Sequence, residues 1–368
     1  MNIAFVYDCV YPFSYGGGEK RHWELARELV QRSHSVSILG QKWWSGPDVL
    51  TRDGVRIVGI APNRPLFTPS GRRSFSQPFF FALHVFRHLR RNRYDVVECA
   101  NFPYLSCIAA RLAAPRTPLA ISWFEVRGFR GWLRYNGPSG IVAALFEKIC
   151  MRLTLRHSAI SPLTASRFPR PIPVVPCGVQ TVLFETDRPR TPASILYVGR
   201  LVPHKRLDML LDAVAQLLPD FPALTLTLIG DGSAKADLLA QAKSLGLSDC
   251  LRINDSHPPD DAVHNAYLSS SVFVLPSEQE GFGIVLVEAM AAALPPIVRV
   301  APDSASSALV NPGKTGLLFS TLPELVSALR TLLADPARAR AMGLAAREAA
   351  RPYAWPAIAA SLESFLAP

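Results

Sequence analysis

Two acidic residues stand eight positions apart in the segment SEQEGFGIVLVEAM, residues 277–290. Glu280 precedes a run typical of a helix, and Glu288 lies within it. The apolar run SVFVL before them predicts a buried parallel strand. The glycines at the junction let the chain turn, so the first N–H groups of the helix could attract phosphate. We expect both carboxylates in one crevice; alternatively, Glu280 caps the helix and Glu288 lies on a solvated face.

Two cations precede another predicted helix. Arg200 and Lys205 lie in GRLVPHKRLDMLLDAV, on either side of Pro203, and both could converge on one diphosphate. Two unit charges about 4 Å apart at an effective dielectric constant of about 20 interact by roughly 4 kcal/mol. The alternative, solvated cations at a helix start, is disfavoured because positive charge there opposes the helix dipole.

The E-x7-E spacing within SEQEGFGIVLVEAM resembles the donor-site signature of glycosyltransferase family 4, and the similarity extends over nearly the whole chain. The resemblance implies an α/β fold of GT-B type, in which two Rossmann-like doubly wound domains face each other across a cleft. It also implies a retaining transferase that uses a nucleotide-diphosphate sugar as co-substrate and requires no metal or other cofactor. Glu280 would contact hydroxyls of the transferred sugar, Glu288 the ribose, and Arg200 and Lys205 the diphosphate.

The same resemblance assigns further positions on the donor side. The segment GGGEKRHWELAREL, from Gly16, resembles the family's N-terminal GG-x-E motif, and GDG at residues 230–232 resembles a second glycine turn. Positions 252 and 253 would lie near the nucleotide base, and 282–284 would act through backbone amides. The residues implied are Gly17, Gly18, Gly230, Gly232, Arg252, Ile253, Phe282, Gly283 and Ile284.

The segment ISWFEVRG, residues 121–128, departs from the family pattern on the acceptor side. Members often carry a histidine where Phe124 stands, and a phenyl ring can neither donate nor accept a proton. A front-side retaining mechanism, in which the leaving phosphate oxygen takes the acceptor's proton, does not need that histidine. Asp8, Glu125 and Arg127 are the nearest candidates to replace it.

Two other function classes compete with transfer. The first is a GT-B protein that binds nucleotide sugar, or partners an active transferase, without catalysis. The second is a dinucleotide-dependent oxidoreductase, which the sequence disfavours because it lacks GxGxxG with a following acid.

Alternating strand and helix patterns predict two doubly wound domains. We expect an acceptor-binding domain over residues 1–180, a linker over 181–192 and a donor-binding domain over 193–350. The resemblance further implies that the segment 351–368 forms a helix that crosses back to the first domain. Further expectations are a helix over 141–157 and an aromatic, basic loop at RGFRGWLRYNG, residues 127–137. Residues 174–179 resemble the family's final strand of the first domain, which implies a strand there.

The formal charge of +10 is unevenly spread: residues 1–185 carry +13 and residues 186–368 carry −3. This charge asymmetry favours a glycan or lipid-linked glycan as the acceptor, whereas the lack of a firm membrane element in the sequence favours a small soluble one. The helix expected over residues 79–91 mixes phenylalanines with arginines, as does the stretch before it with Arg72 and Arg73. This pattern fits a helix on an anionic membrane and, equally, a helix with a buried aromatic side and solvated arginines. No motif supports a nucleic-acid partner.

The six cysteines form no CxxC pair, which predicts buried thiols rather than a zinc site or disulfide framework. His257 and His264 have no ligand cluster around them and are expected to be structural or exposed. The start MNIAFVYDCVYP does not resemble a leader, and no run is long enough to span a bilayer. We expect a cytoplasmic protein that contacts the inner face of the membrane peripherally.

Overall fold

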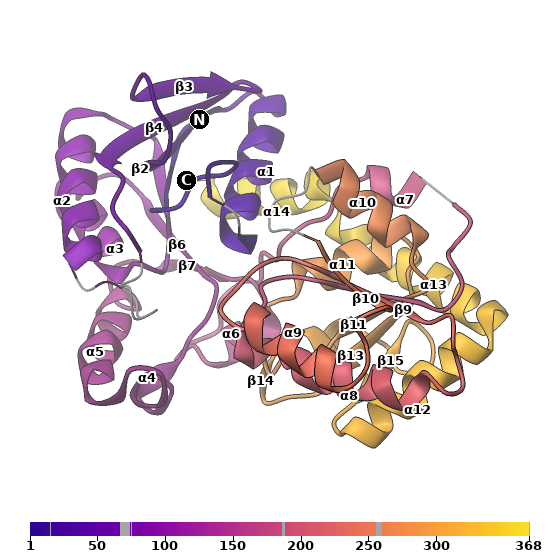
Figure 1. Ribbon diagram of the computed structural model, residues 1–368. Coiled ribbons are helices and arrows are strands. Elements are labelled where there is room, and N and C mark those ends of the chain that lie inside the picture. The colour runs from indigo at the N-terminus through magenta and orange to yellow at the C-terminus, as the bar shows by residue number, and fades with distance from the viewer. Residues whose placement is uncertain (15, 67–73, 75, 186–187, 255–259, 368) are drawn as a thin grey trace. The chain divides into compact units, whose positions relative to one another are not determined.

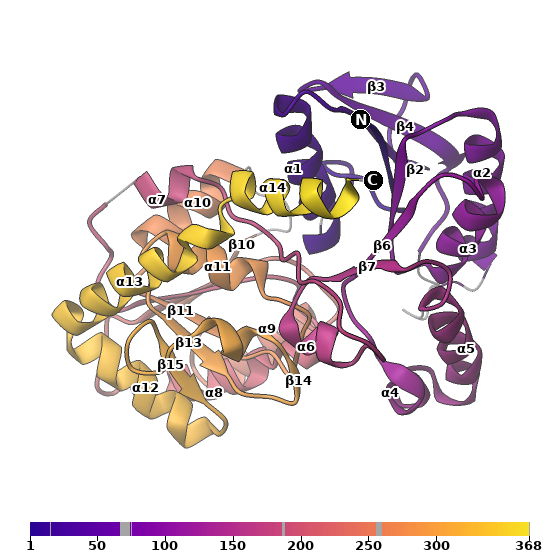
Figure 2. The same cartoon turned by 180° about the vertical axis from the view of Figure 1, so that it is seen from behind.

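The computed structural model describes residues 1–14, 16–66, 74, 76–185, 188–254 and 260–367. The chain forms two compact units: residues 1–177 with 355–368, and residues 178–354. Figures 1 and 2 show a sheet flanked by helices in each unit. Arg72, Arg73 and His257, together with residues 186 and 187 of the expected linker, lie outside the described residues.

The first unit is built on a sheet of seven described strands in the order β3-β4-β2-β1-β5-β6-β7. All neighbours are parallel except β3 and β4. Central strands such as β1 and β5 are buried and, apart from Glu98 in β5, mostly apolar, as expected for a sheet covered on both faces. The strands are β1 (Asn2–Val6), β2 (Ser35–Lys42), β3 (Val49–Arg52), β4 (Val55–Pro62), β5 (Val96–Ala100), β6 (Leu119–Trp123) and β7 (Arg156–Ala159).

Helices cover this sheet in two groups. The C-terminal helix α14 packs against α1, whereas α2 packs on α3 and α3 on α5. One face of α2 enters the core through Phe81, Val85 and Leu89. The helices are α1 (Gly17–Gln31), α2 (Ser76–Arg91), α3 (Tyr104–Ala113), α4 (Gly128–Asn136), α5 (Gly140–Cys150), α6 (Pro162–Ser166) and α14 (Trp355–Leu366), with the 3-10 turn η1 (Gly137–Ser139).

The second unit contains a parallel sheet of six described strands in the order β10-β9-β8-β11-β13-β15, and β12 pairs with β14 beside it. The predicted doubly wound arrangement is therefore confirmed. The strands are β8 (Ser194–Val198), β9 (Thr225–Ile229), β10 (Leu251–Asn254), β11 (Val272–Leu275), β12 (Gln279–Glu280), β13 (Pro296–Arg299), β14 (Asp303–Ser304) and β15 (Leu317–Phe319).

The helices of this unit follow the strands in the usual alternation. They are α7 (Val182–Glu185), α8 (Leu207–Leu217), α9 (Lys235–Ser244), α10 (Asp260–Ser269), α11 (Ile284–Ala291), α12 (Leu322–Ala334) and α13 (Pro336–Ala350), with the 3-10 turns η2 (Pro203–Lys205), η3 (Ser306–Leu309) and η4 (Arg351–Tyr353).

Several local predictions were wrong. The expected loop at residues 127–137 is mostly helix α4, and α5 ends at Cys150 instead of near residue 157. The expected strand over residues 174–179 forms only isolated bridges at Val174 and Val179, because Pro176 between them has no N–H to donate. The short helix α7 lies within the expected linker, and the role of that segment as a linker stays a prediction.

All six cysteines are free thiols, and all but Cys250 are buried, as predicted. Within the described residues, no helix has the length and apolar character that crossing a membrane requires.

Candidate active site

A close polar contact joins Lys205 and Glu280, two of the predicted donor-side residues. Lys205 ends η2, after β8, and Glu280 lies in β12, after β11. The Lys205 Nζ–Glu280 Oε2 distance is 2.5 Å, and both side chains are largely buried. Both segments leave carboxyl ends of neighbouring parallel strands, where open α/β sheets bind ligands. Glu280 therefore pairs with a cation and does not cap α11, whose N-cap residue is Gly283.

Tyr197, at the end of β8, connects this pair to Arg200. Its hydroxyl donates to the backbone oxygen of Arg200 at 3.0 Å. Burial raises the pKa of the Tyr197 phenol, the nearby Glu280 carboxylate raises it further, and Arg200 opposes them. Arg200 itself is exposed. Sequence reasoning missed Tyr197 because in the sequence it is simply one apolar position of a strand.

Glu288 lies on α11 and is only 4% exposed. The hydroxyl of the fully buried Tyr267, on α10, donates to its Oε2 at 2.9 Å. Burial and this carboxylate hold the pKa of Tyr267 well above its usual range, so the phenol stays a donor. The alternative of a solvated Glu288 is therefore wrong, and Tyr267 is a second residue that the sequence did not indicate.

Glycines shape the turns around these side chains. Gly283 has a φ of +99°, so the chain enters α11 from a left-handed residue, and Ile284 is the first residue of the helix. Phe282 is buried, and its ring packs against Tyr353.

A Cβ on Gly230 would lie 2.0 Å from the oxygen of Gly199, and one on Gly232 would lie 2.3 Å from that of Leu201. The turns after β8 and β9 therefore run against each other backbone to backbone. Arg252 is exposed and Ile253 half-buried on β10, at the edge of the same sheet.

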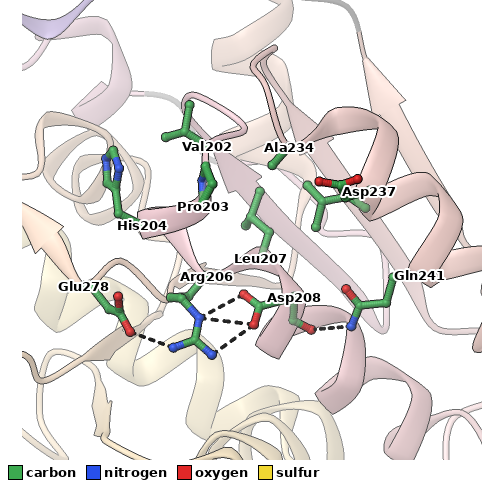
Figure 3. A pocket seen from close by; sticks show the side chains of 11 residues that line it. Val202, Pro203, His204, Arg206, Leu207, Asp208, Ala234, Asp237, Gln241 and Glu278 are labelled. Atoms are coloured by element: carbon green, nitrogen blue, oxygen red, sulfur yellow. Dashed lines mark hydrogen bonds and ion pairs between the residues drawn. The ribbon is translucent and has the colours of Figure 1, made fainter. Parts of the chain in front are cut away.

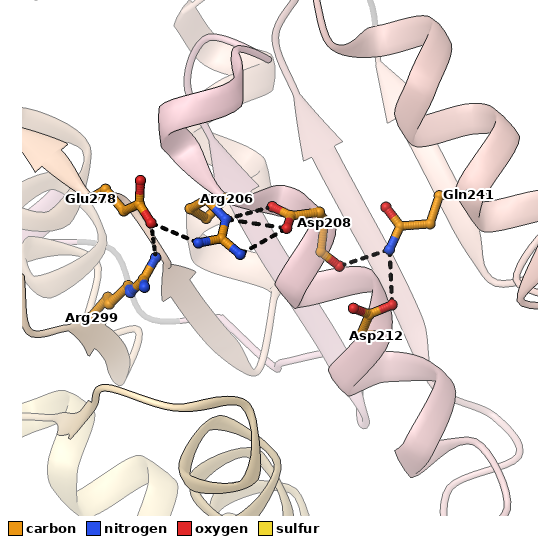
Figure 4. Close-up of polar contacts among 6 residues, drawn as sticks. All are labelled: Arg206, Asp208, Asp212, Gln241, Glu278 and Arg299. Carbon is orange, nitrogen blue, oxygen red and sulfur yellow. Dashed lines mark hydrogen bonds and ion pairs between the residues drawn. The ribbon is translucent and has the colours of Figure 1, made fainter. Parts of the chain in front are cut away.

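An ion-pair network lies beside Lys205. Arg206, with a φ of +52°, contacts Asp208 at 2.9 Å and Glu278 at 2.6 Å, and Arg299 contacts the same Glu278 oxygen at 3.1 Å. Figure 4 shows Glu278 between the two guanidinium groups. Because Glu278 lies two residues before Glu280, the network ties the Lys205 turn to the Glu280 strand. No sequence pattern predicted it.

A pocket of about 510 Å³ opens next to this network. Its lining includes Pro203, His204, Arg206, Asp208 and Gln241, and Figure 3 shows Arg206 between Asp208 and Glu278. None of the predicted donor-side residues lines it.

In the first unit, helix α1 begins at Gly17, one position before Gly18, with Gly16 as its extended N-cap residue. The carboxylate of Glu19 lies next to Gly16. The hydroxyl of Ser14 donates to this carboxylate at 3.2 Å. Asp8, a candidate to replace the missing histidine, is fully buried and accepts from the amide of Gln77 at 3.0 Å.

Phe124 packs into a ring cluster. Its centroid lies 6.3 Å from that of Tyr7 and 5.8 Å from that of His22, and Arg21 lies over its face. His22 Nε2 and Arg21 both face Glu98, which is buried in β5, between β1 and β6 in the sheet. Burial alone would raise the pKa of the Glu98 carboxyl, but His22 and Arg21 lower it overall. Sequence reasoning missed this charged cluster because Glu98 lies 76 residues after His22 in the chain.

The two remaining candidates after β6 pair with each other. Arg127 contacts Glu125 at 2.8 Å, and the Glu125 side chain is 45% exposed. Among the described residues, no group of three His, Cys, Asp or Glu side chains is arranged to hold a metal ion.

Solved structures share this architecture over the whole chain. Sucrose-phosphate synthase from Thermosynechococcus elongatus superposes with a TM-score of 0.80 at 21% identity, covering 98% of this chain and 97% of its own. WaaG, a glycosyltransferase of lipopolysaccharide biosynthesis, has a TM-score of 0.76 at 17% identity, with 99% of each chain covered. The protein has the GT-B fold.

Two family models and one relative show to which protein family the chain belongs. The model of the glycosyl transferase 4-like domain matches residues 16–178, and that of glycosyl transferases group 1 matches residues 180–349. D-inositol 3-phosphate glycosyltransferase of Kineococcus radiotolerans is 31% identical over 93% of this chain and 88% of its own. A mannosyltransferase of Komagataeibacter xylinus, named for GDP-mannose and cellobiosyl-diphosphopolyprenol, is 34% identical over 50% of this chain and 47% of its own. This chain belongs to glycosyltransferase family 4.

Proposed function

We propose that the protein transfers a sugar from a nucleotide-diphosphate sugar to a hydroxyl acceptor with retention of configuration at the transferred carbon. The observation that carries the proposal is the Lys205–Glu280 contact, which sets a cation and a carboxylate side by side at the carboxyl ends of two strands. A cation there suits the diphosphate, and a carboxylate suits hydroxyl groups of the sugar.

We assign the donor contacts as the sequence predicted. Arg200 and Lys205 bind the diphosphate, Glu288 holds the ribose, and the backbone at the start of α11 faces sugar and phosphate oxygens. The two cations and the helix N-terminus would stabilise the charge that develops on the leaving diphosphate, so the proposed reaction does not require a metal ion. The names of related proteins support this donor class: HepE of Anabaena was solved with UDP and glucose.

The proposed acceptor is a glycan or a lipid-linked glycan. The basic first half of the chain supports it, as does the relative named for a diphosphopolyprenol acceptor. Contact of the first unit with an anionic membrane stays a prediction, and a surface suited to it is described below.

Phe124 favours a second candidate, a GT-B protein that binds nucleotide sugar without transferring it. Its ring packs against Tyr7 and His22, and it offers no proton donor or acceptor.

Incubation of the purified protein with a panel of nucleotide-diphosphate sugars and lipid-linked acceptors, with and without a chelator, separates the two candidates. The proposal expects a product whose anomeric configuration, read by NMR, equals that of the donor, at a rate that the chelator leaves unchanged. Inversion or chelator sensitivity would contradict the proposed mechanism. Donor binding without turnover would favour the second candidate.

A further inference from the structure

Helix α5 turns an apolar face to solvent. Five of its residues are exposed, and four of these are aliphatic, with 37–58% of their surface accessible. The spacing of three and four residues places them along one side of the helix. Exposed apolar groups gathered in this way mark interaction surfaces. We call this side the α5 face; it consists of Ile141, Val142, Leu145, Lys148 and Ile149.

The surroundings of the α5 face are basic. Lys148 belongs to it, Arg152 follows the helix, and Arg130 and Arg134 are exposed on α4. The one acid between residues 128 and 156 is Glu147, which is 2% exposed. An apolar stripe accompanied by cations, in a segment whose one acid is buried, complements a bilayer that carries anionic headgroups.

Buried polar contacts fix the orientation of α5. The carboxylate of Glu147, on its inner side, accepts from the hydroxyl of Tyr104 at 2.8 Å and from the indole of Trp132 at 3.0 Å. It also accepts from the backbone N–H groups of Arg127 and Gly128 at the start of α4. Turning the apolar residues inward would break these contacts, so the α5 face is held outward.

We propose that the α5 face docks the protein on an anionic lipid bilayer. This interaction goes beyond transfer and does not depend on the donor site. Helix α2, where the sequence suggested membrane contact, is the weaker candidate, because only three of its seven exposed residues are apolar, at Phe79, Leu83 and Phe86.

Sedimentation with vesicles tests the proposal. The full chain is mixed with vesicles of phosphatidylcholine and phosphatidylglycerol, or of phosphatidylcholine alone. The parent binds the anionic vesicles, and the double variant Leu145→Glu with Ile149→Glu binds at least about tenfold more weakly, because two apolar contacts are replaced by two repelled charges. Leu344→Glu, on α13 and 42% exposed, is the matched control and binds like the parent.

Circular dichroism and binding of nucleotide-diphosphate sugars stay unchanged in the double variant, which separates lost docking from lost folding. Equal vesicle binding by parent and double variant would overturn the proposal. Loss of vesicle binding in Leu83→Glu alone would show that the docking surface lies on α2, and this result would also overturn the proposal. If the parent does not bind vesicles but forms a dimer, and the double variant does not form a dimer, the α5 face binds a second copy of the chain instead of a bilayer.

Discussion

Lys205 and Glu280 are each other's partners, so their effects on a ligand are coupled. Removing either side chain leaves a largely buried charge without its counter-ion, and such a loss costs more than the pair itself contributes. Under the proposed function, a donor would meet this pair as one unit, with the ammonium toward phosphate and the carboxylate toward sugar. Tyr267 similarly fixes the carboxylate of Glu288, because a phenol with a raised pKa remains a hydrogen-bond donor.

Lys205→Ala should lower kcat/KM for transfer by about a hundredfold or more, because a charge contact to the leaving group is lost. Steady-state kinetics with a saturating acceptor measures it. Arg330→Ala, which breaks an exposed ion pair with Asp220, is the control and should leave kcat/KM unchanged. Similar kinetics for parent and Lys205→Ala would remove Lys205 from the site.

His157 makes the first unit sensitive to acid. The indole of Trp123 donates to its Nδ1 at 2.9 Å, and Nε2 faces the oxygen of Thr154, so the buried ring is neutral. Burial lowers the pKa of His157 to about 4. Between that value and the unfolded value near 6.5, the unfolded chain binds more protons, so stability falls as the pH falls.

The free energy of unfolding should therefore drop by about 2 kcal/mol from His157 alone between about pH 8 and about pH 5. Urea titrations of the parent and of His157→Gln at both pH values measure this share. The variant should be less stable at the higher pH and should lose less on acidification. An identical loss in both proteins would show that His157 does not titrate as described.

At the scale of elements, close contact between two backbone segments determines the conformation of the loops after β8 and β9. Gly230 and Gly232 bring these turns into contact where a side chain does not fit, and Gly283 lets the chain enter α11. Arg206 is different, because it adopts a left-handed conformation despite having a side chain. Its ion pairs with Asp208 and Glu278 offset that conformational cost.

Gly230→Ala should destabilise the second unit by about 3 kcal/mol or more, since its Cβ would meet the Gly199 oxygen at 2.0 Å. Gly246→Ala is a matched control: Gly246 also has a positive φ, but nothing lies within 4 Å of its Cβ, so only about 1 kcal/mol is expected. Chemical denaturation of both variants measures the difference. Equal losses would contradict the close approach of the two turns.

Arg206→Gly should be more stable than Arg206→Ala by about 1 kcal/mol, because both lose the ion pairs but only glycine relieves the left-handed backbone. Thermal unfolding of the two variants gives the comparison. An alanine variant as stable as the glycine variant would mean that the turn relaxes to another conformation.

At the scale of the molecule, the sequence predicted both parallel sheets, because each strand and the helix that follows it are indicated by a local pattern of consecutive residues. It also suggested that Lys205 and Glu280 belong to one site. It did not indicate Tyr197, Tyr267 or the ring partners of Phe124, since packing brings them together from distant segments. Helix α4 was missed because three glycines and three aromatic residues in RGFRGWLRYNG are typical of loops.

The central claim is that the second unit binds a nucleotide-diphosphate sugar through Arg200, Lys205, Glu280 and Glu288. Isothermal titration calorimetry against uridine, guanosine, adenosine and thymidine diphosphate sugars tests it most directly, with Arg200→Ala, Glu288→Ala and the control Arg330→Ala. The account predicts saturable binding of one donor, weakened about tenfold or more by the first two substitutions and unchanged by the third. Binding that both site variants retain in full would contradict it.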